Sequence, residues 1–169
     1  MNESDKPTGD VRLLADAMLG KLAKWLRLLG YDTAYNHAWD DAAVVRLARA
    51  EGRIVLTRDR VLSERRGLQA LLLTSDELEE QMAQIMNELH LPPAEAGSRC
   101  SICNAPLEPI AKEEVEGRVP PYVFRTQEEF YRCPQCDRIY WPGGHWARMQ
   151  PVMNRLRDAG SRRQRGTRQ

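Results

Sequence analysis

The sequence predicts an α/β domain with a parallel sheet, followed by a small module built around four cysteines. Two features support this prediction. Short apolar runs alternate with segments of helical period through residues 11–91, and two Cys-x-x-Cys pairs follow a linker rich in proline and alanine at residues 92–98. Strands and helices that alternate over short connections favour a parallel sheet with helices covering both sides.

Composition and charge indicate one folded domain plus a small module. The chain has 169 residues, of which 42% are hydrophobic and 29% are charged, with a formal net charge of +1. Such a chain can bury a core. Residues 1–10 are polar and indicate a flexible leader rather than a secretory signal. The apolar stretch at residues 11–30 is interrupted by charged residues, so it cannot span a bilayer. We therefore expect a cytoplasmic protein with no membrane partner.

The segment Arg53–Arg60 is the centre of the predicted sheet. Its apolar run at residues 54–56 is typical of a strand buried on both faces. Polar groups just past the carboxyl end of such a strand lie where open α/β sheets bind their ligands. Asp59 therefore either holds a metal ion at this edge or only caps the short helix that follows. The polar residues that end the run are Thr57, Arg58, Asp59 and Arg60.

The remaining elements alternate in the same way. Gly30 and Gly52 follow the last residue of two helical periods, which is the usual position for a glycine that ends a helix. The first helix has one apolar face and another face with Lys21, Lys24 and Arg27, which is either solvated or turned toward an anion. The predicted strands lie at residues 11–15, 31–35 and 70–73, the predicted helices at 19–29, 41–51 and 77–89, and a helical turn at 61–66.

Acidic residues recur at the ends of the predicted strands. Asp16, Asp59 and Asp76 each follow a strand, and a further acid starts the helix before the central strand. Right-handed crossovers bring the carboxyl ends of parallel strands to one edge, so these carboxylates should converge there. Carboxylates held close together repel one another unless a cation lies between them, and oxygen ligands favour Mg²⁺ or Mn²⁺ over zinc. For Asp76, a capping box with Glu79 is the alternative interpretation.

Four cysteines in two Cys-x-x-Cys pairs predict a structural zinc site. In a reducing compartment such pairs bind metal rather than form disulfides, and four thiolates hold Zn²⁺ in a closed tetrahedron with no open position. We expect a loop containing Pro120 and Pro121 between the pairs, and we expect zinc removal to unfold residues near 99–150 while sparing the preceding domain. The ligands would be Cys100, Cys103, Cys133 and Cys136.

Basic and aromatic residues surround the second cysteine pair and continue toward the carboxyl terminus. They either stack bases and contact phosphates or pack a module that has little other core. The tail from Arg155 onward has a local charge of +5, which leaves the rest of the chain near −4. This tail either attracts an anionic partner such as nucleic acid or is a disordered, solubilising segment. The residues around the cysteines are Arg132, Arg138, Tyr140, Trp141, His145, Trp146 and Arg148.

Two long motifs resemble a known family. The segment Leu14–Thr33, LADAMLGKLAKWLRLLGYDT, and the segment Gly52–Arg60, GRIVLTRDR, resemble the Mut-seven C-terminal RNase family. The paired cysteines, the segment Ile139–Trp141 and His145 resemble the zinc ribbon of that family. The resemblance extends from residue 11 to about residue 153 and leaves out the leader and the arginine tail.

The resemblance implies a PIN-like domain with three layers, α/β/α, at residues 11–91. A linker at 92–98, a zinc ribbon at 99–153 and a flexible basic tail at 154–169 would follow. It further implies metal-dependent cleavage of RNA, with zinc as a structural ion and with Mg²⁺ or Mn²⁺ as the catalytic ion. Carried over by position, the catalytic, metal-binding acids would be Asp16, Asp41, Asp59 and Asp76.

Asp41 is chosen over Asp40 because it takes the place of the acid in the family's acid-then-helix pattern before Val44 and Val45. The leading hypothesis is a ribonuclease that hydrolyses phosphodiester bonds with help from the ribbon in RNA binding. A non-catalytic RNA-binding adaptor on the same scaffold and a protein-interaction module that uses the ribbon are the alternatives. The residues expected to contact RNA are Lys21, Lys24, Arg58, Arg60, Arg138, His145 and Arg148.

Overall fold

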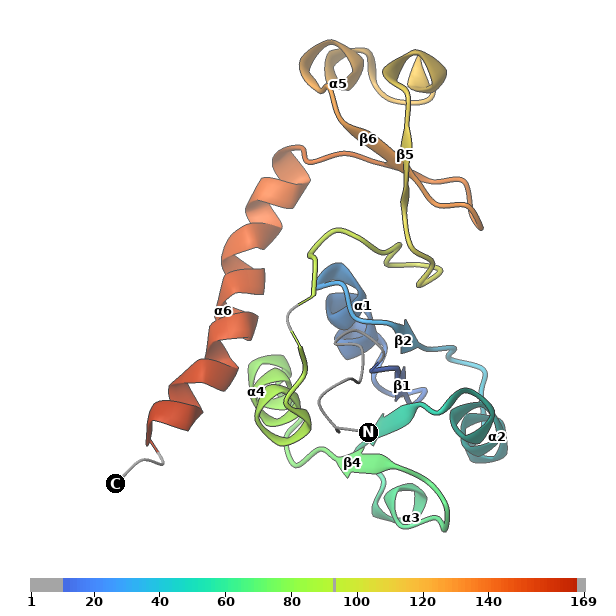
Figure 1. The fold of residues 1–169 in the computed structure, drawn as a ribbon, viewed down its shortest axis with the longest axis vertical. Helices are drawn as coiled ribbons and strands as arrows, with labels where there is room; N and C mark the ends of the chain where they lie inside the picture. Colours follow the sequence, from blue (N-terminus) through green and yellow to red (C-terminus); the bar gives the residue numbers. More distant parts are fainter. Residues whose placement is uncertain (1–10, 93, 167–169) are drawn as a thin grey trace, which may run out of the picture.

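The computed structural model describes residues 11–92 and 94–166 of the chain. It contains a sheet domain (residues 11–91), a ribbon (residues 99–140) and a long carboxyl-terminal helix. Figure 1 shows the ribbon above the sheet domain and the long helix running from the ribbon down past the sheet domain.

The sheet domain is built on four parallel strands in the order β2-β1-β3-β4. The central pair, β1 and β3, aligns Leu14 with Val55 and Ala15 with Leu56. The direction of strand addition reverses at β1 and β3, so their carboxyl ends flank the position where open α/β sheets bind ligands. The predicted parallel sheet is confirmed. Its strands are β1 (Leu13–Ala15), β2 (Thr33–Ala34), β3 (Ile54–Thr57) and β4 (Ala70–Leu72).

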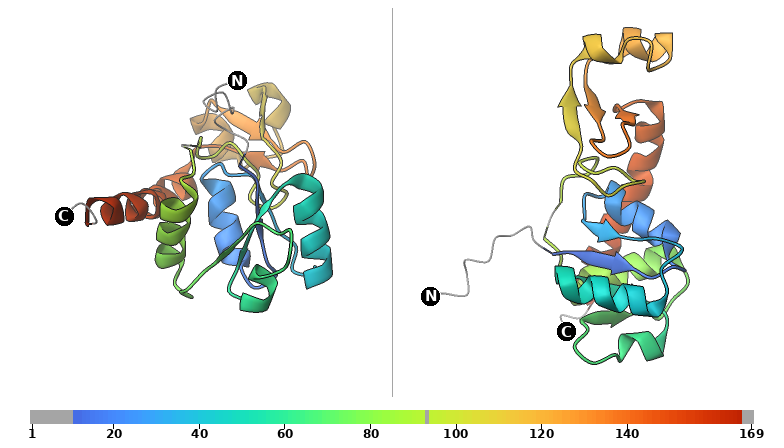
Figure 2. Two further views of the ribbon diagram at one scale, coloured as in Figure 1. Left: turned by 60° about the horizontal axis from the view of Figure 1, so that its bottom comes forward. Right: turned by 90° about the vertical axis from the view of Figure 1, so that its right-hand side faces the viewer.

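Helices cover both faces of this sheet, as predicted. Leu13 and Ala15 of β1 pack in one core with α1 and α4, whereas Leu14 packs in a second core with α2 and α3. Figure 2 (left) shows α1 and α4 on one side of the strands and α2 on the other. Because successive side chains of a strand point to opposite faces, the continuous apolar runs are explained by burial on both sides. The helices are α1 (Gly20–Leu28), α2 (Asp41–Glu51), α3 (Arg60–Ser63) and α4 (Leu78–Leu89).

The predicted helix ends agree with the backbone. Gly52 has φ of 67° and ends α2 in the left-handed region, and Gly30 has φ of 99° just past the end of α1. A residue with a Cβ is strained in this region, which is why glycine marks both helix ends in the sequence.

The ribbon is a three-stranded antiparallel sheet in the order β5-β6-β7. Instead of the predicted loop around Pro120 and Pro121, a small helical insertion lies between β5 and β6. Pro121 occupies the first turn of α5, and Val123 of that helix packs with Phe130 in a core of the insertion itself. Proline is favoured in a first helical turn because the missing N–H has no partner there. The elements are β5 (Glu108–Ile110), η2 (Lys112–Val115), α5 (Pro121–Thr126), β6 (Phe130–Arg132) and β7 (Ile139–Tyr140).

The carboxyl-terminal segment differs from the expected flexible tail, since α6 (Gly144–Gly166) continues well past residue 154. Met153 and Leu156 of α6 are fully buried in the core of the sheet domain that contains α1 and α4. The sequence contains the signal for this helix, because Met149, Val152, Met153 and Leu156 have the spacing of one helical face. Neither α6 nor any other described helix is both long and apolar enough to cross a membrane.

Candidate active site and zinc site

A chain of hydrogen bonds joins two of the predicted acids at the carboxyl ends of the central strands. Asp16 directly follows β1, and Asp59 lies two residues after Thr57, the last residue of β3. The Thr57 hydroxyl donates to Asp16 Oδ2 at 2.5 Å and accepts from the Asp59 backbone N–H at 2.9 Å. Thr57 is completely buried, so it holds both acidic loops in register. This positioning role of Thr57 was not predicted from the sequence.

Asp59 is also the N-cap of α3. Its Oδ1 accepts from the backbone N–H groups of Val61 at 2.9 Å and Leu62 at 3.3 Å. Asp16 makes a similar turn, because its Oδ1 accepts from the Met18 N–H at 3.0 Å. The structure therefore confirms that Asp59 caps the short helix, as considered from the sequence. Among the described residues, Oδ2 of Asp59 accepts no hydrogen bond, so one oxygen stays free for a ligand.

The other two predicted acids lie at the outer strands of the same edge. Asp40 is the N-cap of α2, with its Oδ1 accepting from Ala43 N–H at 2.8 Å, and Asp41 is the exposed first residue of the helix. Because Asp40 makes the cap, the carboxylate of Asp41 is not needed to start α2, and the choice of Asp41 stays a prediction. Strand order places the acids along the edge as Asp41, Asp16, Asp59 and Asp76.

Asp76 does not form the capping box considered from the sequence. The N-cap of α4 is Glu77, which makes no side-chain cap, and the Glu77 N–H donates to Ser75 Oγ at 3.0 Å. Asp76 is exposed beside this turn. Its carboxylate is therefore not required for the start of α4.

The four aspartates are more spread out than the cysteines. Within residues 11–92 and 94–166, the four cysteines lie close enough together to hold one ion. The four aspartates, all within the same described residues, do not form such a group. Mg²⁺ is commonly held by one or two carboxylates and several waters rather than by an all-protein cage. The carboxylates of Asp16 and Asp59 fit that donor set, and the ion itself stays a prediction.

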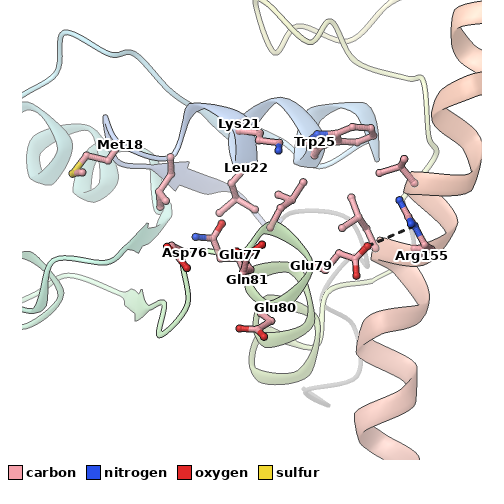
Figure 3. A pocket seen from close by; sticks show the side chains of 14 residues that line it. Met18, Lys21, Leu22, Trp25, Asp76, Glu77, Glu79, Glu80, Gln81 and Arg155 are labelled. Carbon is pink, nitrogen blue, oxygen red and sulfur yellow. Dashed lines mark ion pairs between the residues drawn. The ribbon is translucent and has the colours of Figure 1, made fainter.

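A pocket of about 660 Å³ lies beside this edge, between α1, α4 and α6. Lys21 and Asp76, two predicted site residues, both line it (Figure 3). Arg155 of α6 lines the opposite end, with its Nε 3.6 Å from Glu79 Oε1. A segment expected to be a flexible tail thus forms one wall of the pocket.

Six of the seven residues expected to contact RNA are exposed in the structure. Arg27, which the sequence placed on the basic face of the first helix with Lys21 and Lys24, is only 6% exposed and does not belong to a solvated face. The indole of Trp141 packs against the core of the ribbon insertion, so that aromatic residue has a packing role. The His145 side chain lies outside the described part of the structure. The exposed residues are Lys21, Lys24, Arg58, Arg60, Arg138 and Arg148.

The four cysteines are gathered closely enough to hold a metal ion, as the sequence predicted. Their Sγ atoms all lie within 4.8 Å of one another, no disulfide joins them, and Cys100 Sγ is 3.8 Å from Cys136 Sγ. Tetrahedral Zn²⁺ with Zn–S bonds of about 2.3 Å needs sulfur atoms about 3.8 Å apart, so the set fits zinc. Burial and the neighbouring thiols, Cys136 foremost, raise the pKa of Cys103 to about 12, as expected for a thiol held beside other thiols.

Arg27 fastens the first cysteine pair to the sheet domain. Its Nη1 donates to the carbonyl oxygens of Ser101 and Ile102, each at 3.1 Å, and its Nε donates to Thr33 O at 2.8 Å. Both carbonyls belong to residues between Cys100 and Cys103 in the chain. The position of this knuckle therefore depends on a buried guanidinium from α1.

Asn104 makes a second attachment. Its Oδ1 accepts from the Thr33 N–H of β2 at 2.9 Å, and its Nδ2 donates to Asp32 Oδ1 at 2.6 Å. Arg53 donates to the same Asp32 oxygen at 2.8 Å. Burial alone would raise the pKa of Asp32, but the hydrogen bonds from Arg53 and Asn104 outweigh it and lower that pKa. We call Arg27, Asp32, Arg53 and Asn104 the interdomain clamp.

The family follows from the comparison with known proteins. The family model described as the Mut7-C RNAse domain matches residues 11–153. The chain belongs to the Mut7-C RNAse family. The match includes the sheet domain with its acidic edge, the ribbon with its cysteines and α6 as far as Met153, so the predicted membership is confirmed. Membership in this Mut7-C RNAse family indicates a nuclease and a role connected with RNA. Neither curated proteins nor solved structures yielded a match.

Proposed function

We propose that this Mut7-C RNAse family protein is a metal-dependent ribonuclease that hydrolyses RNA phosphodiester bonds. The observation that supports the proposal most is the hydrogen-bonded set Asp16–Thr57–Asp59 at the carboxyl ends of β1 and β3. Open α/β sheets bind their ligands at such a position, and acids held there in advance need little rearrangement to act.

Asp16 and Asp59 would hold Mg²⁺ or Mn²⁺, with Asp41 and Asp76 contributing from the two sides. When bound, the ion would supply an activated water and neutralise the charge that develops on the leaving oxygen. Thr57 orients Asp16 through its buried hydroxyl. Zinc at the four cysteines is a closed structural site and takes no part in the chemistry.

The exposed cations beside the acids would hold the RNA backbone. Arg58 and Arg60 flank Asp59, and Lys21 and Lys24 lie on α1, which follows the Asp16 turn. Arg138 and Arg148 are exposed and follow the cysteines in the chain, where they would lengthen the contact, and His145 is proposed with them. Phosphate contacts of this kind position RNA without reading its bases.

A non-catalytic RNA-binding adaptor is the second candidate. Two observations favour it: one oxygen of Asp59 already caps α3, and the four aspartates do not gather into a preformed ion site. An adaptor would bind RNA through the same cations and would have no use for exposed carboxylates facing phosphates. The two candidates therefore differ in cleavage and agree in binding.

Incubation with RNA separates these candidates. The purified protein is mixed with a pool of single-stranded and structured RNA, with Mn²⁺, with Mg²⁺ or with no added divalent ion. The ribonuclease proposal expects cleavage that requires the divalent ion and is lost in Asp16→Asn. Tight, salt-dependent binding without cleavage in any of these conditions favours the adaptor.

Truncation after Asp158 is expected to lower RNA affinity and to leave cleavage at saturating RNA nearly unchanged. It removes the last four tail arginines but keeps Leu156, whose burial makes truncation after Met153 unsuitable. Each lost phosphate contact should reduce the slope of log affinity against log salt by about 0.7 on single strands. Filter binding at several salt concentrations measures this slope.

The truncation is compared with the double variant Lys24→Ala and Arg58→Ala, which removes two cations proposed to lie beside the acids. It is expected to lower the single-turnover cleavage rate at saturating RNA, because these side chains would position the scissile phosphate. The truncation and the double variant could also lower affinity equally and leave single-turnover cleavage unchanged. That result would mean that the cations bind RNA but do not position the scissile phosphate.

A further inference from the structure

Two large apolar side chains project into solvent beside the acidic pair. Met18 is 91% exposed and Val61 is 71% exposed. They are two of the four exposed large hydrophobic residues in the described part of the chain, and the other two, Ile102 and Tyr122, lie in the ribbon. Single exposed apolar residues are common, but a pair at one site needs an explanation.

The two residues occupy equivalent positions in a repeated local motif. Asp16-Ala17-Met18-Leu19 follows β1, and Asp59-Arg60-Val61-Leu62 follows β3 closely. In each, the backbone N–H of the exposed residue donates to Oδ1 of the aspartate two positions earlier, at 3.0 Å and 2.9 Å respectively. Each exposed side chain is thus fixed beside one of the two acids.

The leucine that follows in each motif already supplies the packing contact. Leu19 is buried in the core with α1 and Leu62 in the core with α2 and α3. Met18 lies at the end of the pocket away from Arg155 (Figure 3). Neither Met18 nor Val61 is therefore needed to anchor its loop, and an apolar side chain there loses contact with water only when a partner covers it.

We propose that Met18 and Val61 contact the bases of the nucleotides on either side of the phosphate held at Asp16 and Asp59. This inference rests on the proposed function. A single-stranded RNA with one phosphate at the acids has its neighbouring bases displaced to the two sides, where they can lie on apolar side chains. Methionine suits such a contact because its flexible thioether adapts to different rings. The cations Arg58 and Arg60 flank Asp59 in the chain and precede Val61, so charged and apolar groups alternate there as charge and ring do in a nucleotide chain.

The test compares RNA binding of Met18→Gln, Val61→Thr and the parent protein. Both changes keep side-chain size and lie at exposed positions, so melting temperatures should match that of the parent. Ile102→Thr is the control, since it also replaces an exposed β-branched apolar side chain with threonine, at a position that is 56% exposed in the ribbon. The probes are an oligouridylate and an oligomer of equal length with an abasic ribose at every position, both with Ca²⁺ in place of Mg²⁺ or Mn²⁺, so that a cation bound by oxygen ligands can hold the phosphate at the acids.

Each of the two variants is expected to bind oligouridylate about fivefold more weakly than the parent, whereas Ile102→Thr binds like the parent. The salt slope of binding should not change, because a base contact releases no counterions. On the abasic oligomer all four proteins should bind equally. A loss that persists on the abasic oligomer, a flattened salt slope, or parental affinity in both variants would overturn the inference.

The outcomes also distinguish this inference from the ribonuclease proposal. If the variants lose affinity for oligouridylate but the parent cleaves no RNA, the base contacts stand and the adaptor function replaces the ribonuclease. If the parent cleaves RNA and the variants bind and cleave as the parent does, the ribonuclease stands and the base contacts are wrong. Absence of RNA binding by the parent would overturn both.

Discussion

Asp59→Asn should lower single-turnover cleavage by at least about 100-fold while the protein stays folded. The change removes the charge that would hold the divalent ion. It keeps the side-chain oxygen that caps α3, and asparagine is as good an N-cap as aspartate. The measurement is the cleavage rate at saturating RNA with Mg²⁺ or Mn²⁺, together with the melting temperature.

Asp59→Ala is the companion variant, because it removes both the charge and the cap. It should be as inactive as Asp59→Asn and should also lose about 1 kcal/mol of folding stability. If Asp59→Asn cleaves at the parental rate and only Asp59→Ala is impaired, then Asp59 acts through the cap alone and its assignment as a metal ligand is wrong.

Removing zinc should destabilise the sheet domain as well as the ribbon. The linker at residues 92–98 led us to expect an independent sheet domain, but the structure joins the first cysteine pair to α1 and β2 through the interdomain clamp. Loss of zinc would free the knuckle and leave the buried Arg27 without two of its acceptors, and an unpaired buried charge is costly. The ribbon also leads directly into α6, whose Met153 and Leu156 complete the core of the sheet domain.

Hydrogen exchange on Cys133→Ser is the measurement, with the zinc-loaded parent as reference. Structural zinc contributes about 10–16 kcal/mol to the folding of small zinc modules, so a loss of several kcal/mol in the amide protection of β1 and β2 is expected. Arg27→Gln separates the clamp from the metal: it should keep its zinc and lose about 2–3 kcal/mol of stability. Unchanged protection of β1 and β2 in Cys133→Ser would show that the two parts fold independently.

The sequence by itself determined the features that follow from local pattern. Apolar runs of strand length between helical periods predicted a parallel sheet, because a strand with apolar residues on both faces must be covered on both sides. Cys-x-x-Cys spacing predicted the metal site, because two such turns supply a complete tetrahedral ligand set. The positions of Asp16, Asp59 and Asp76 at one sheet edge followed from the parallel direction of the predicted strands, whose carboxyl ends lie at the same edge.

Tertiary structure decided the features that depend on which element packs against which. Arg27 lies three residues after Lys24, so its position in the sequence suits an exposed helix face. It is buried only because the first cysteine pair docks against it. The docking of α6 likewise decides that Leu156 is core rather than tail, although its helical spacing is visible in the sequence. Thr57 links Asp16 to Asp59 because β1 and β3 are neighbours, and residues 41 positions apart in the chain meet only once the sheet has formed.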